Sequence, residues 1–178
     1  MKSMLRNFIL VSFFASSTIL SFAQKAITPL DLNNRLADIT DTLYKYGSDW
    51  GKQVGIAMSK KDFTVLAPYR KKAEQYADKK FLEVTTMKDI SGSENLRAAM
   101  LEFLAYEKLL IKEHFYEFEK LAKTATNDDV QKLIQKLVTA SEKEGAALKK
   151  VNDAQTEYAK KNGFTIDEAD TAEKEGGK

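Results

Sequence analysis

The chain of 178 residues contains no cysteine, one histidine and two prolines. Without cysteine it can form neither a disulfide nor a C-x-x-C-H haem attachment, and it offers no cysteine for a bacterial lipid anchor. A di-iron bundle needs a Glu-x-x-His on each of two helices, whereas this chain has only His114, preceded at the third position by Ile111. Motifs of serine hydrolases, phosphate-binding loops and zinc proteases are also missing. We therefore expect a protein that is not an enzyme and carries no cofactor.

A strong excess of one charge is also missing, since 28 basic residues face 26 acidic ones. Two of the basic residues, Lys2 and Arg6, lie in the first 23 positions, and leaving them out gives 26 of each sign. Phosphate binding requires a concentrated excess of Lys and Arg. Nucleic acid is therefore not expected as a partner.

Residues 1–23 have the pattern of an export signal. Lys2 and Arg6 precede a short apolar run over residues 8–20, and Ser21-Phe22-Ala23 places small residues at the −3 and −1 positions of a cleavage site. The run is too short for a comfortable membrane span. We expect an exported protein that keeps no integral membrane segment after the signal is removed.

The rest of the chain shows apolar residues at helical spacing in four stretches. Thr28-Pro29 starts the first, at about 29–59, and Asp62 caps the second, in which Pro68 predicts a kink or a start displaced toward Ala67. A capping box, Ser91-x-x-Glu94, is expected to open the third. The fourth runs from a cap at Thr126 to Asn162-Gly163.

Short links between long helices favour antiparallel neighbours, so the pattern predicts an all-α fold, an up-down-up-down four-helix bundle. The bundle domain is expected over residues 24–164. Residues 165–178 are acidic and poor in apolar side chains, which predicts a disordered tail.

The polar residues that interrupt the apolar faces are the candidate site residues. Glu107 precedes His114 by seven positions, which places both on one face of a regular helix. With Glu144 or Glu113 they are expected to form either a structural polar layer or a weak metal site. A haem held by His114 together with Met58, Met87 or Met100 is a further alternative.

Gly47, Gly51 and Gly55 stand four residues apart on the first predicted helix, beside Trp50. Glycine inside a helix costs about 1 kcal/mol relative to alanine, so a compensating reason is expected. The favoured interpretation is close approach of another helix. The alternative is a shallow groove with Trp50 on its wall, open to a ligand or partner.

Two segments are similar to a family pattern: Asp89-Ile90-Ser91-Gly92 before the third helix, and Ala159-Lys160-Lys161-Asn162-Gly163-Phe164 at the end of the fourth. The chain resembles the leptospiral-type surface-protein family, uncharacterised exported helical proteins of bacteria. The resemblance implies an all-helical fold and export to the periplasm or cell surface of a diderm bacterium. It implies no activity and no site residues.

These observations lead to two hypotheses about function. The first is a non-enzymatic exported bundle that binds a protein or envelope component through a helix face. The alternative is a ligand or cofactor binder, with haem or metal near His114. The candidate cluster is His114, Glu107 and Trp50.

We predict cleavage between Ala23 and Gln24, because the small residues of the cleavage site end there. N-terminal sequencing of the protein recovered outside the cytoplasm should begin at Gln24. Retention of Met1 in that material, or a start before residue 20, would contradict the prediction.

Overall fold

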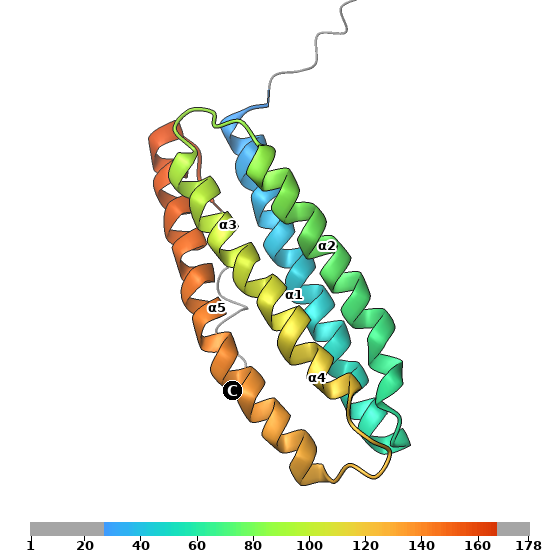
Figure 1. Ribbon diagram of the computed structural model, residues 1–178. Coiled ribbons are helices and arrows are strands. Elements are labelled where there is room, and N and C mark those ends of the chain that lie inside the picture. The colour runs from blue at the N-terminus through green and yellow to red at the C-terminus, as the bar shows by residue number, and fades with distance from the viewer. Residues whose placement is uncertain (1–26, 167–178) are drawn as a thin grey trace, which may run out of the picture.

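The structure is a computed structural model that describes residues 27–166; the predicted signal and most of the predicted tail lie outside these residues. Its elements are α1 (Pro29–Lys60), a 3-10 turn η1 (Phe63–Leu66), α2 (Ala67–Thr86), α3 (Glu94–Leu109), a π-helical segment η2 (Leu110–Phe115), α4 (Tyr116–Glu119) and α5 (Asn127–Asn162). No strand occurs among the described residues. The fold is the all-α four-helix bundle predicted from the sequence (Figure 1).

The two longest helices begin as the sequence predicts. Thr28 caps α1 and Thr126 caps α5, each through a reciprocal capping box with the Asp three residues later. Pro29 occupies the first turn of α1, where its missing N–H costs nothing. Gly163 ends α5 in the left-handed conformation, with φ 72°.

The second helix begins late, which confirms the displaced start predicted from Pro68. Asp62 caps the 3-10 turn η1 by accepting a hydrogen bond from the Thr64 N–H. The α2 helix follows from Ala67 and contains Pro68 in its first turn. The proline therefore starts a helix rather than bending one.

The predicted Ser91–Glu94 capping box is wrong. Ser91 adopts φ 51° in the link before the helix, and the cap of α3 is Ser93. The Ser93 hydroxyl accepts a hydrogen bond from the Ile90 N–H instead of capping α3. The link is held further by Arg97, which donates two hydrogen bonds to the Asp89 carboxylate, each 2.7 Å long.

The helices run alternately up and down, and α3, η2 and α4 form one continuous rod (Figure 1). The rod packs against α5 and α2, and α1 packs against α2 and α5. The apolar stripes predicted from periodicity supply the core; its largest fully buried side chains are Phe103, Phe118, Leu32, Leu36, Ile39, Leu66, Leu96, Met100, Leu104, Ile111, Val84 and Val130.

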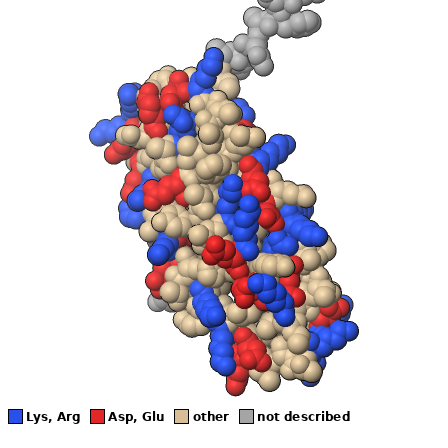
Figure 2. Space-filling model, viewed as in Figure 1, with Lys and Arg blue, Asp and Glu red and all other residues tan. Residues whose placement is uncertain are grey.

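The outer surface is mixed in charge. On the face seen in Figure 2, acidic and basic side chains are interspersed over the whole length of the bundle. Within residues 27–166 no helix has the length and apolarity needed to cross a membrane.

One buried ion pair ties α2 to α4. The guanidinium of Arg70 donates hydrogen bonds to Glu119 and to Glu74. The side chains of Arg70 and Glu119 are each only 10 % exposed. Loss of one partner would leave the other charge without compensation in a place that water reaches poorly.

We therefore expect Arg70→Leu to lower the free energy of unfolding by about 3 kcal/mol, since it leaves Glu119 unpaired. Adding Glu119→Leu should restore most of that loss. Urea denaturation measures both effects. Lys149→Leu is the control, because the Lys149–Asp153 pair is 75 % and 62 % exposed and should contribute less than about 0.5 kcal/mol. Equal losses in the single and double variants would contradict the interpretation.

Candidate functional site

A cavity of about 490 Å³ lies inside the bundle, between α1 on one side and α3, η2 and α5 on the other. Most of its lining is apolar and the cavity opens to solvent beside Tyr44 and Val138, which are 66 % and 49 % exposed. The lining comprises Thr40, Leu43, Tyr44, Gly47, Ser48, Trp50, Gly51, Ala73, Phe103, Glu107, Leu110, Ile111, Phe115, Leu137, Val138, Ser141, Glu144 and Leu148.

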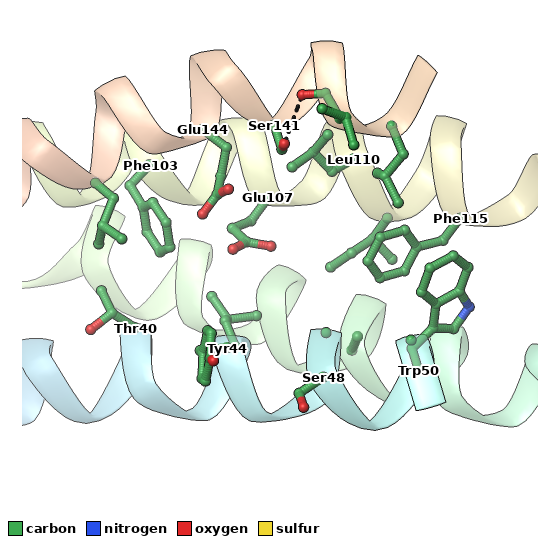
Figure 3. A pocket seen from close by; sticks show the side chains of 18 residues that line it. Thr40, Tyr44, Ser48, Trp50, Phe103, Glu107, Leu110, Phe115, Ser141 and Glu144 are labelled. Carbon is green, nitrogen blue, oxygen red and sulfur yellow. Dashed lines mark hydrogen bonds between the residues drawn. The ribbon is translucent and has the colours of Figure 1, made fainter. Parts of the chain in front are cut away.

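Two carboxyl groups lie in this mostly apolar space. Glu107 comes from α3 and Glu144 from α5, and their side chains point toward one another (Figure 3). Burial, followed by the nearby Glu144 carboxyl, raises the pKa of Glu107 to about 8. Burial also raises the pKa of Glu144. At neutral pH the Glu107 carboxyl is therefore mostly protonated.

Within residues 27–166 no counter-charge compensates the two acids. Among the residues that the structure describes, those lining the cavity include no Lys, Arg or His. Within the same range, no ion pair reaches Glu107 or Glu144. A buried acid without a partner is costly to ionise, and the raised pKa of Glu107 is the consequence.

Aromatic rings close one end of the cavity. The ring of Trp50 stacks on Phe115, with centroids 3.8 Å apart and planes within 6°, and meets Phe118 edge-on at 5.1 Å. In Figure 3 this stack lies at the end of the cavity opposite Thr40 and Phe103. Trp50 is only 3 % exposed, so it is part of the core as well as of the cavity wall.

No described helix packs closely against the glycines of α1, so the favoured interpretation, close approach of another helix, is wrong. A Cβ placed on Gly47, Gly51 or Gly55 would meet nothing within 4 Å. Gly47 and Gly51 line the cavity, while Gly55 lies one turn further along α1 and outside it. The absence of side chains at the first two positions leaves space at the mouth, which is the alternative that the sequence offered.

The structure separates His114 from Glu107. His114 lies in η2, and the i→i+5 hydrogen bonding of a π-helix takes more residues per turn than an α-helix. The seven-residue spacing consequently no longer returns to the same face. His114 is partly buried and lines a second groove, on the α3–α5 side, together with Tyr106, Leu109, Leu110, Lys132, Gln135, Lys136, Thr139, Ala140 and Lys143.

Of the candidate cluster, the cavity thus contains Trp50 and Glu107 but not His114. Within the described part of the chain no group of three or more His, Cys, Asp or Glu side chains could hold a metal ion. The methionines considered as haem ligands do not line the groove of His114, and Met100 is fully buried in the core.

The sequence analysis named Glu144 only as an alternative to Glu113, as a partner of Glu107 and His114. A signal for it exists, because Glu144 stands seven residues after Leu137 and four before Leu148, on the apolar stripe of α5. Reasoning from sequence missed the polar residues Thr40, Ser48 and Ser141 of the lining. No pattern distinguishes these from other hydroxyl residues on helices.

A scan against protein-family models found no match, and searches of curated proteins and of solved structures found none either. The resemblance to the leptospiral-type surface-protein family therefore stays a prediction.

The raised pKa of Glu107 predicts a loss of stability with rising pH. The ordinary pKa of a Glu is 4.5 and that of Glu107 in the fold is about 8. Between these values the folded state holds a proton that the unfolded state has lost, so the stabilisation is complete below pH 4.5 and disappears as the pH rises through 8. We expect the free energy of unfolding to fall by about 2–4 kcal/mol between pH 5 and pH 9, allowing for water at the cavity mouth.

Urea denaturation at several pH values measures this dependence. Glu107→Gln should flatten most of it, because an amide does not titrate. Glu142→Gln is the matched control on an exposed position of α5 and should keep the slope of the wild type. A wild-type protein of equal stability at pH 5 and pH 9 would contradict the assignment.

Proposed function

We propose that the protein binds a small, mostly apolar molecule in the cavity between α1, α3 and α5. The observation that carries the proposal is the cavity itself, about 490 Å³ in volume and open at one side. Ligand sites in proteins are usually pre-formed pockets of about 300–1,000 Å³ with apolar walls and a few polar groups. In this cavity the two acids and the Tyr44 hydroxyl supply those polar groups, whereas the Thr40 and Ser141 hydroxyls donate to carbonyls of their own helices.

The local sequence supports a space that is kept open. Two glycines at the mouth weaken α1 by about 1 kcal/mol each relative to alanine, and no neighbouring helix needs them to be small. The π-helical segment beside the cavity is a second departure from regular helix, and such segments are frequent at functional sites. Both features are consistent with a binding site rather than with tight packing.

The other hypotheses stay predictions. Binding of a protein or envelope component through a helix face would require a continuous apolar patch, whereas the exposed large apolar side chains come from several elements, among them Tyr44, Ile56, Leu82, Tyr116 and Val138. The haem or metal alternative placed the ligand at His114, outside the cavity described above. We also propose that the protein is exported to the periplasm or cell surface and binds its ligand there.

Filling the mouth of the cavity should weaken binding strongly without unfolding the protein. In the variant Gly47→Leu/Gly51→Leu, the added side chains enter open space on α1, and leucine favours a helix over glycine by about 0.8 kcal/mol per position. We expect the melting temperature to stay equal or rise. The apparent affinity for the neutral apolar dye N-phenyl-1-naphthylamine, measured from its fluorescence enhancement, should fall at least about tenfold.

Gly55→Leu is the matched control. It adds the same side chain to the same helix, again with nothing within 4 Å of its Cβ, but outside the cavity lining. This variant should bind the dye as the wild type does. If the wild type does not bind the dye, or if both variants lose binding equally, the cavity is not the binding site.

A further inference from the structure

We propose that the molecule bound in the cavity carries an amine, and that its ammonium group lies between the carboxyl groups of Glu107 and Glu144. This inference rests on the proposed function and names the chemical class of the ligand. It stands on the geometry of the cavity: two acids from different helices converge in an apolar enclosure, and no described lining residue is basic.

The charge of the site favours a cation over other head groups. A carboxylate ligand would bring a further negative charge into a mostly apolar space whose own two acids are already costly to ionise, and no basic residue in the described lining could pair with it. A neutral hydroxyl could form hydrogen bonds but would leave the carboxyls without a counter-charge. An ammonium group has three N–H donors and a full positive charge, so it can satisfy oxygens of both acids at once.

The rest of the cavity lining indicates which kind of apolar group the amine would carry. The walls beside the acids are apolar and include Phe103, Leu110 and Leu148, and the Trp50–Phe115 stack closes one end. An unbranched alkyl chain or an aromatic ring attached to the amine would bury its apolar surface against them. The expected ligand is thus an apolar amine, with its charged group at the two acids.

Binding should be accompanied by release of a proton. The titratable groups that face Glu107 are Glu144 from α5 and the Tyr44 phenol from α1; η2 and α2 contribute only apolar side chains to the cavity. Glu107 is mostly protonated near neutral pH, because burial raises its pKa to about 8. An incoming ammonium ion favours the carboxylate, so the Glu107 proton passes to the buffer as the ion pair forms.

The test compares three probes that share a ten-carbon chain: decylamine, decanol and decanoate, each below its aggregation concentration. Displacement of N-phenyl-1-naphthylamine at pH 7 gives their relative affinities for the full chain. We expect decylamine to bind at least about tenfold more tightly than decanol, and decanoate to bind most weakly. Titration calorimetry in phosphate and in Tris should show proton release with decylamine and none with decanol.

The variant Glu107→Gln/Glu144→Gln should bind decylamine and decanol equally well and release no proton, while it still binds the dye. Glu142→Gln, on an exposed position of α5, should keep the wild-type preference for the amine. The double variant is expected to fold, since an amide replaces an acid of nearly the same shape and removes a charge that burial disfavours.

The outcomes separate this inference from the proposed function. Equal binding of decylamine and decanol by the wild type would overturn the amine preference and leave the apolar binding site intact. Tighter binding of decanoate would overturn it as well, in favour of an acid bound by the protonated carboxyl. Absence of any probe or dye binding would overturn the proposed function itself.

Discussion

The Glu107 carboxyl lies in an apolar cavity opposite the Glu144 carboxyl, and no described residue compensates either of them. Elsewhere in the bundle a buried charged side chain has partners of opposite charge: Arg70 donates hydrogen bonds to Glu119 and Glu74. The cavity is therefore an exception within this fold. A core of only apolar side chains at these two positions would satisfy the same helix packing without the cost of desolvated acids.

The π-helical segment η2 determines which side chains meet at that place. Within this wider turn Ile111 and Phe115 line the cavity while His114 lines the second groove, so the stack of Phe115 on Trp50 depends on the π segment. In a regular helix the register after residue 110 would differ by about one position. The aromatic wall of the cavity and the separation of the only histidine from the acids thus have one common cause.

The periodicity of apolar residues predicted the helices, their order and most of the core, because burying one face of each long helix leaves few alternatives to a bundle. The helix caps at Thr28 and Thr126 were also predictable, because these side chains form hydrogen bonds with the backbone of the first turn. The π segment was not predictable, since Leu110–Phe115 has the apolar spacing of an ordinary helical stretch. For that reason the sequence suggested Glu107 with His114, whereas the fold brings Glu107 together with Glu144.

The glycines of α1 show the same limit of sequence-based prediction. Their spacing indicated a special surface, but only the space around them distinguishes a groove from a helix contact.

The end of the bundle away from the π segment shows how the remaining sequence features serve the fold. The Tyr158 hydroxyl donates a hydrogen bond to the Ile90 carbonyl, and Asn162 donates one to the Ser91 carbonyl, so the end of α5 holds the α2–α3 link. The two segments behind the family resemblance are therefore in contact, and their residues have structural roles in closing the bundle. A resemblance that rests on residues with such structural roles carries no information on a ligand. The features on which we base the proposed binding site lie further along the bundle, where α1 has glycines in place of side chains and two acids occupy space that packing alone would fill with apolar groups.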